Sequence, residues 1–219
     1  MFFSLNVFSQ ALEEKIEKFL LENPEVILKS LQNFEEKKAK EQEVTNQKII
    51  NENLESLTDS SNGLFDGNIN SKKIVVKFFD FNCSYCKKAH NDIQKLLKKE
   101  DVKVIYKNFP ILSENSVFLA KLGIFIAEKD IDSFNSFYKM INENKGRVSK
   151  EKLSEITKKL GVNLDELNNE QVNSRLEKKL KEDVDLANKL GLRGTPAFVV
   201  GNEIIFGYVP ADELLNKIN

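Results

Sequence analysis

The sequence is short of net charge, histidine and cysteine. Its 219 residues include 33 Lys and Arg and 34 Asp and Glu, so the formal net charge is −1. Because this composition offers no strongly basic surface, we expect no nucleic-acid partner. His90 is the one histidine, which leaves a zinc site short of its usual four or so ligands, and we expect no metal of that kind. The length is sufficient to bury a core in one domain with an appendage.

Both cysteines, Cys83 and Cys86, fall in one short stretch between two segments of different character. The run 73–79 is β-branched and aromatic, which is typical of a largely buried strand. After Ser84 the apolar residues recur at helical spacing, which predicts a helix with Cys83 at its N-terminus. There the unpaired backbone N–H groups and the helix dipole stabilise a thiolate, the reactive form of cysteine. The pattern therefore predicts a dithiol redox site in which Cys86, one turn further in, resolves a mixed disulfide.

Two other interpretations of the cysteine pair are a structural disulfide and a copper site. A disulfide that closes so short a loop would constrain the unfolded chain little. Two soft thiolates would also suit copper(I), so a Cu(I)-binding module stays open as an alternative of another class. We expect no cofactor beyond the dithiol itself. His90 lies about two helical turns from Cys83, too far to act as its base, and we expect it to be a solvent-side helix residue.

A second motif occurs far away in the sequence, at 191–200. Its residues, Gly-Leu-Arg-Gly-Thr-Pro-Ala-Phe-Val-Val, predict the end of a helix and then a proline that opens an apolar strand. Proline has no N–H group for a sheet ladder, so at the start of a strand it marks an edge or a special turn. Together with the strand–CxxC–helix pattern, this motif resembles the thioredoxin superfamily. The resemblance implies that Pro196 is a cis-proline beside the cysteine pair and that Ser84, Tyr85, Thr195 and Pro196 form the substrate-binding loops.

The first residues, 1–11, are apolar but too short to span a membrane, and they have no basic leader. They look like the tail of a secretory signal, with Ser9 and Ala11 at the small-residue positions before a cleavage point. We therefore expect 1–11 to be a signal-peptide remnant and the signal to begin upstream of Met1. An ordinary hydrophobic N-terminal arm is the alternative.

Residues 12–58 are predicted to be helical. Asn23-Pro24 interrupts the pattern, with Asn23 as the N-cap and Pro24 as the first residue of a second helix. The first part of this segment carries an apolar stripe that no neighbouring element obviously covers, and such stripes mark association surfaces. We predict that 12–58 is a helical arm for oligomerisation; folding back onto the domain is the alternative. Residues 59–72 have turn chemistry and open the domain 59–219.

The remaining elements of the domain follow from hydrophobic periodicity and from capping residues. A second strand is predicted over 102–107, and two further strands over 197–200 and 203–206 with a Gly-Asn turn between them. Helices fill the interval of about 113–190, and a last helix begins near Pro210. The order is βαβ, a helical insertion, then ββα. The predicted fold class is therefore α/β: a thioredoxin fold with an inserted helical domain and an N-terminal helical arm.

Within the thioredoxin superfamily, the chain resembles the DsbA-like periplasmic thiol–disulfide oxidoreductases, in particular the suppressor-of-copper-sensitivity C (ScsC) branch. Three features carry this resemblance: Asn-Pro-Glu-Val at 23–26, Phe-Phe-Asp-x-Asn-Cys-x-Tyr-Cys-Lys-Lys-Ala at 78–89, and Gly-Thr-Pro-Ala-Phe-Val-Val-Gly at 194–201. The resemblance implies a periplasmic protein that acts on protein disulfides or thiols, works with a membrane redox partner and forms a trimer through its arm.

Two residues near the predicted site bear on whether the protein is an isomerase or an oxidase. Tyr85 between the cysteines and Thr195 before the proline look more like the isomerase pattern than the strong-oxidase pattern, which has CxHC and Val-Pro. Disulfide isomerase or reductase is therefore the leading expectation, and a monomeric DsbA-like dithiol oxidase is the alternative.

One position departs from the superfamily pattern. Many thioredoxin-like proteins have a buried acid six residues before the first cysteine, where this chain has Lys77. If its side chain points inward, the ammonium would favour the thiolate of Cys86, while burial would lower the pKa of the lysine. In those proteins the acid handles the proton of the buried thiol; if Lys77 points to solvent, that role is missing or passes to water. Asp80 is nearer the cysteines, and its context predicts a turn or capping residue. We treat Lys77 and Asp80 as candidate tuning residues.

Overall fold

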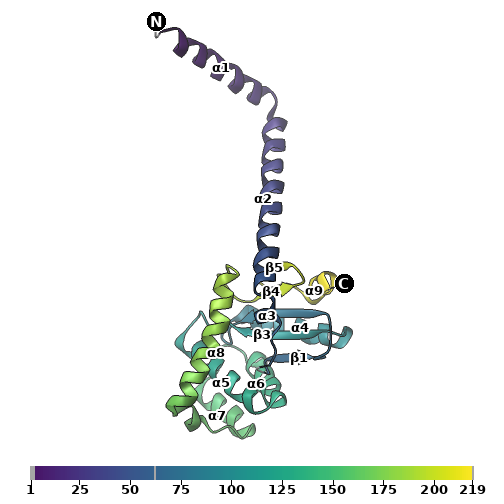
Figure 1. Cartoon of the computed structure of the whole chain (residues 1–219), viewed down its shortest axis with the longest axis vertical. Helices are drawn as coiled ribbons and strands as arrows, with labels where there is room; N and C mark the ends of the chain where they lie inside the picture. The colour runs from purple at the N-terminus through teal and green to yellow at the C-terminus, as the bar shows by residue number, and fades with distance from the viewer. Residues whose placement is uncertain (1–2, 62, 219) are drawn as a thin grey trace. The chain divides into compact units, whose positions relative to one another are not determined.

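The computed structural model describes residues 3–61 and 63–218 (Figure 1). The chain forms two compact units, Met1–Thr45 and Asn46–Asn219. Of the predicted signal-peptide remnant 1–11, residues 1 and 2 lie outside the described residues, and the rest begins the first helix. That this segment is a remnant of a signal stays a prediction.

The first unit consists of helix α1 (Phe3–Glu22) and the larger part of helix α2 (Pro24–Glu52). Pro24 is the first residue of α2, as predicted. Asn23 does not act as the predicted cap: its side-chain amide donates to the carbonyl oxygen of Phe19 at 2.8 Å, at the end of α1. Exposed apolar side chains recur at helical spacing and form what we call the apolar stripe: Leu12, Ile16, Phe19, Ile27, Leu31 and Phe34.

The second unit is built on a sheet whose strand order, within the described residues, is β1-β3-β2-β4-β5. Its strands are β1 (Phe65–Gly67), β2 (Ile74–Phe79), β3 (Lys103–Asn108), β4 (Ala197–Val200) and β5 (Glu203–Phe206). β2 and β3 are parallel, and the other neighbouring pairs are antiparallel. β1 was not predicted, because its three residues lie among turn-forming residues and show no alternation; pairing with β3 creates it.

Helices surround this sheet. They are α3 (Leu54–Thr58), α4 (Ser84–Lys99), α5 (Glu114–Lys129), α6 (Ile131–Glu143), α7 (Lys150–Lys159), α8 (Glu170–Lys189) and α9 (Ala211–Ile218), with a short 3₁₀ helix η1 (Leu164–Asn168). The elements from α5 to α8 follow β3 and precede β4, and they gather into one helical group (Figure 1). The order βαβ, inserted helices and ββα confirms the predicted α/β fold class.

Alternate residues of the central strands pack on opposite faces of the sheet. The larger core lies on one face, includes Val75 and Phe79, and is completed by side chains from α4 to α9. The smaller core lies on the other face and joins Val76 to Ile50 of α2 and Leu57 of α3. Ile50 and Leu57 are each 1% exposed. The last part of the segment predicted as an arm therefore packs into the core of the second unit.

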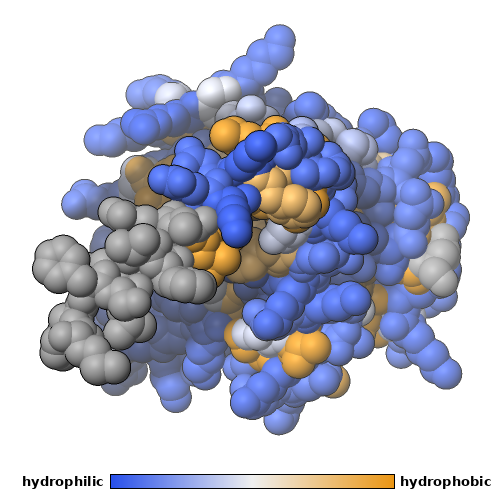
Figure 2. Space-filling view, turned by 90° about the horizontal axis from the view of Figure 1, so that it is seen from above, coloured by the Kyte–Doolittle hydropathy of each residue, from blue (hydrophilic) through white to orange (hydrophobic). Residues whose placement is uncertain are grey.

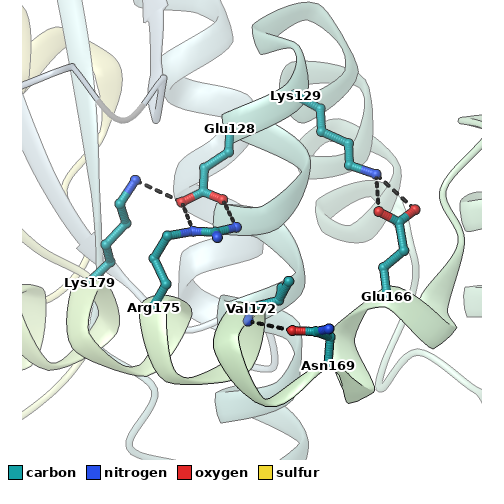
Figure 3. Close-up of polar contacts among 7 residues, drawn as sticks. All are labelled: Glu128, Lys129, Glu166, Asn169, Val172, Arg175 and Lys179. Atoms are coloured by element: carbon teal, nitrogen blue, oxygen red, sulfur yellow. Dashed lines mark hydrogen bonds and ion pairs between the residues drawn. The ribbon is translucent and has the colours of Figure 1, made fainter.

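Ion pairs connect the elements of the helical group (Figure 3). Glu128 on α5 pairs with Arg175 at 2.9 Å and with Lys179 at 2.8 Å, both on α8. Lys129, the next residue of α5, pairs with Glu166 of η1 at 2.8 Å. Since most of these side chains are well exposed, each pair contributes at most about 1 kcal/mol, and apolar packing remains the main source of stability.

Charged residues make up 31% of the sequence. Seen from above, the visible face is mostly hydrophilic, with patches of hydrophobic residues between the hydrophilic ones (Figure 2). No helix in the described part of the chain is both long and apolar enough to cross a membrane.

Candidate active site

Both cysteines lie at the junction between β2 and α4. Strand β2 ends at Phe79, and Cys83 is the N-cap residue of α4, as the sequence predicted. The backbone N–H of Cys86 donates to the Sγ atom of Cys83 at 3.2 Å. A sulfur atom thus occupies the place where helices usually have a side-chain oxygen, and a backbone donor of the first turn points at it. Both cysteines are free thiols.

The loop before β4 lies against this helix start. The Thr195–Pro196 peptide bond is cis. When Cys83 is protonated, its Sγ atom donates to the carbonyl oxygen of Thr195 at 3.1 Å. Antiparallel pairing of β2 with β4, with Phe78 opposite Ala197, holds the two segments in this register. The fold therefore brings together the two motifs that lie far apart in the sequence.

The two thiols differ strongly in pKa. Hydrogen bonds from Cys86 stabilise the thiolate of Cys83 and, against partial burial, lower the pKa of Cys83 to about 6. Cys86 is completely buried, and desolvation together with its hydrogen bond to Cys83 raises its pKa well above the ordinary value of a thiol. At neutral pH the start of the helix therefore carries a thiolate, of which 6% is exposed, while the thiol of Cys86 behind it keeps its proton.

Lys77 points inward and is 0% exposed. Its Nζ atom donates to the carbonyl oxygen of Cys86 at 3.2 Å and to the hydroxyl of Tyr138 at 3.0 Å. Burial lowers the pKa of Lys77 to about 8, against the attraction of the thiolates of Cys86 and Cys83. Tyr138, on α6, was not identified from the sequence as part of the site. A tyrosine in an apolar helical pattern carries no signal of such a contact.

Asp80 shapes the turn before the cysteines. Its Oδ1 atom accepts from the backbone N–H of Asn82 at 2.8 Å, and its Oδ2 atom accepts from that of Leu112 at 3.0 Å. Asp80 thereby connects the turn to the segment after β3, which is the geometry of a turn residue. Ser84 and Tyr85, between the cysteines, are exposed, and 61% of Tyr85 is accessible. They are the parts of the motif that a bound molecule can reach.

His90 is not the solvent-side residue that the sequence predicted. It is 2% exposed, and its ring packs edge-on against Tyr138 with centroids 5.4 Å apart. Burial, reinforced by the charges of Lys77 and Lys139, lowers the pKa of His90 to about 4, so the imidazole is neutral near pH 7. The prediction failed because α6 covers this side of α4, a contact that helical periodicity alone does not reveal. Among the described residues, no group of three or more His, Cys, Asp or Glu side chains could hold a metal ion.

The lowered pKa of Cys83 predicts a pH dependence. The reactive thiolate should form as the pH rises through about 6 and disappear below it. We expect alkylation of the reduced protein by iodoacetamide to follow this midpoint, with mass spectrometry locating the modification at Cys83. Cys86→Ala removes the side-chain hydrogen bond to Cys83 and should raise the midpoint. Protein unfolded in urea provides the control, with a midpoint near the ordinary value of about 8.5; the same midpoint in the folded protein would contradict the prediction.

Comparisons with known proteins agree with this geometry. Residues 74–219 match a family model described as a DSBA-like thioredoxin domain. A curated relative, the "Probable disulfide bond formation protein D" of Bacillus cereus, is 30% identical over 141 residues. That match covers 58% of this chain and 65% of the relative, so the chain spans less than two thirds of that protein.

Two solved structures are similar over most of the chain. The thiol-disulfide exchange protein alpha-DsbA2 from Wolbachia pipientis has a TM-score of 0.73 and 26% identity, over 81% of this chain and 96% of that chain. The ScsC protein of Proteus mirabilis, in a transitional conformation, has a TM-score of 0.69 and 23% identity, over 97% of this chain and 96% of that chain. At that identity the second likeness shows a shared fold.

Proposed function

Since this chain belongs to the DSBA-like thioredoxin domain family, we propose that it is a thiol–disulfide oxidoreductase that acts on protein disulfides through Cys83 and Cys86. The observation that carries this proposal is the difference between the two thiols. Cys83 has a lowered pKa and lies beside the Thr195–Pro196 loop with 6% of its surface exposed, whereas Cys86 is completely buried and has a raised pKa. A dithiol enzyme needs this difference, because one sulfur has to attack the substrate and the other has to wait for the mixed disulfide.

In substrate reduction, the thiolate of Cys83 attacks one sulfur of a substrate disulfide. An S–S bond forms to Cys83, and the other substrate sulfur leaves as a thiolate. Cys86 then loses its proton and attacks Sγ of Cys83, which forms the Cys83–Cys86 disulfide and releases the second substrate sulfur. Two electrons pass from the protein dithiol to the substrate, and the reverse sequence oxidises a substrate dithiol. In isomerisation, a substrate thiolate attacks the mixed disulfide instead, and the protein dithiol is regenerated.

The substrate chain would lie along the loop Thr195–Pro196. The carbonyl oxygen of Thr195 is 3.1 Å from Sγ of Cys83, so any chain that presents a sulfur to Cys83 has to pass close to this loop. Ser84 and Tyr85, which follow Cys83, are exposed and would supply polar and apolar contacts to the same chain.

Disulfide isomerisation or reduction is the leading reaction in this proposal, and dithiol oxidation is the alternative. The residues Tyr85 and Thr195 support the isomerase, as does the exposed apolar stripe, which an assembly would cover. Two assays distinguish these reactions. In the first, the reduced protein is mixed with ribonuclease that contains scrambled disulfides; in the second, the oxidised protein is mixed with a peptide dithiol. An isomerase in its reduced form restores ribonuclease activity without an added oxidant, whereas an oxidase transfers its disulfide rapidly to the peptide. If neither exchange occurs, the proposed function is wrong.

We further propose that the protein forms a trimer through the apolar stripe and works in the periplasm with a membrane redox partner. The stripe supports the assembly because Leu31 and Phe34, one helical turn apart on α2, are 53% and 56% exposed. The presence of only two cysteines, both in the motif, suits an oxidising compartment, since no third thiol can misreact.

The assembly gives a prediction for the full-length chain in solution. Light scattering should report a mass near three times that of the monomer, and Leu31→Asn combined with Phe34→Asn should convert it to monomer. The matched control, Lys29→Asn with Glu36→Asn, introduces two asparagines on the opposite side of α2 and should leave the mass unchanged. Equal masses for both double variants would contradict the role of the stripe.

A further inference from the structure

Lys77 is a buried cation whose hydrogen-bond partners are both uncharged. Its Nζ atom contacts the carbonyl oxygen of Cys86 and the hydroxyl of Tyr138, and in the part of the chain that the structure describes no carboxylate forms an ion pair with it. Lys107, on the neighbouring strand, is almost equally buried but lies 3.7 Å from the carboxylate of Asp183. Burial of an ammonium without a counter-ion is unfavourable. Lys77 therefore needs a partner that its packing does not supply.

Cys83, as a thiolate near pH 7, and Cys86, once it has lost its proton, are the groups that can present a negative charge to this ammonium. Both thiolates raise the pKa of Lys77, while burial lowers it to about 8. The other titratable groups around this space are Tyr106 on β3, Tyr138 and Lys139 on α6, His90 on α4 and Asp66 on β1. The two tyrosines have pKa values well above the ordinary range, and the histidine has one well below it, so these three are neutral near pH 7. Apart from burial, the charge of Lys77 thus depends on the state of the two cysteines.

We propose that the Lys77 amine accepts the proton of the Cys86 thiol when Cys86 resolves the mixed disulfide, an inference that rests on the exchange reaction proposed above. Once Cys83 is part of a mixed disulfide, its thiolate is gone, and with it the negative charge that favours the protonated form of Lys77 at neutral pH. The amine becomes available at the moment when Cys86 has to ionise. The proton moves from Sγ of Cys86 to Nζ of Lys77, and the resulting thiolate forms the S–S bond with Cys83 while the substrate leaves as a thiolate.

The disulfide that forms leaves the Lys77 ammonium without an anion, so it has to release its proton. A pocket of about 290 Å³ offers a route. The hydroxyl of Tyr138 accepts a hydrogen bond from Nζ of Lys77. Tyr138 also lines this pocket, and two other lining residues, Asp132 and Lys139, are exposed. His90 lines the same pocket. Its Nδ1 atom is buried and has no hydrogen-bond partner among the described residues, so it can accept a hydrogen bond from a water molecule in the pocket.

Single-turnover kinetics of the reduced, full-length protein with a fluorescent peptide disulfide separate attack by Cys83 from resolution by Cys86. Lys77→Met should leave the first step essentially unchanged and slow the second by about 100-fold, the range of a lost general base, so that the mixed disulfide accumulates. Lys77→Arg should remain slow, because a guanidinium keeps the charge but cannot accept a proton. Lys107→Met removes an equally buried ammonium from the next strand and should leave both steps unchanged.

A normal rate of resolution in Lys77→Met overturns the inference, and so does rescue by Lys77→Arg, since charge alone would then be sufficient. Failure of the wild-type protein to form a mixed disulfide at all would overturn the proposed function instead. A second measurement needs no substitution and covers the case of a variant that does not fold. The ¹³Cε resonance of Lys77 should titrate at lower pH after Cys83 has been blocked with iodoacetamide than before. An unchanged or higher titration midpoint would also overturn the inference.

Discussion

Replacement of Cys83 by serine is expected to reduce disulfide exchange to the background rate, a loss of at least about a thousandfold. Serine keeps the size of the side chain and can cap α4, but its hydroxyl does not ionise near neutral pH. Cys86 cannot replace the lost nucleophile, because it is completely buried and its pKa is raised. The measurement is the initial rate of exchange with a peptide disulfide, with circular dichroism as the control for folding.

Cys86→Ser is the matched variant, and its expected behaviour is different. Attack by Cys83 should still occur, and the mixed disulfide should accumulate because no thiol resolves it. Mass spectrometry would detect a covalent adduct on Cys83 that reducing agent removes. If Cys86→Ser failed to form the adduct while Cys83→Ser formed it, the assigned roles of the two cysteines would be reversed.

Replacement of Asp183 by alanine is expected to destabilise the second unit by about 3 kcal/mol. Asp183, on α8, is 5% exposed and accepts hydrogen bonds from Asn108, from its backbone N–H at 2.8 Å and from its side-chain amide at 3.2 Å. Its carboxylate also lies 3.7 Å from Nζ of Lys107. Alanine would leave a buried ammonium without a counter-ion and a buried N–H without an acceptor, at the place where the helical group meets the sheet. Urea unfolding of wild type and variant gives the difference in free energy.

Two controls separate this effect from the loss of any acidic residue of α8. The side chain of Asp185 is about half exposed, at 49%, and pairs with Lys181 on the same helix, so Asp185→Ala should change stability by no more than about 0.5 kcal/mol. The double variant Lys107→Met with Asp183→Leu removes both charges together and should be more stable than Asp183→Ala, because no unpaired charge remains buried. Equal destabilisation by Asp183→Ala and Asp185→Ala would show that the buried pair contributes nothing.

Much of the candidate site could be predicted because its chemistry is local. A run of β-branched residues, a cysteine at the N-cap of a helix and a proline at a strand start each act over a few bonds, through side-chain sterics and unpaired N–H groups. The helix start at Cys83 and the fold class were confirmed for this reason. Errors arose where a residue depends on a partner far along the chain. Asn23 bonds to Phe19 instead of capping α2, and the three residues of β1 become a strand only by pairing with β3.

The sequence by itself determined the order of elements from β2 onward, the cysteine pair and the polarity of its helix, since these depend on neighbouring residues. Only the tertiary structure decided that Lys77 points inward, that Tyr138 meets it and that His90 is buried. A strand residue can face either side of its sheet, and the face is chosen by the register with the next strands and by the helix that covers it. For Lys77 that helix is α4, whose buried thiol gives the lysine a chemical role that its position in the sequence does not reveal.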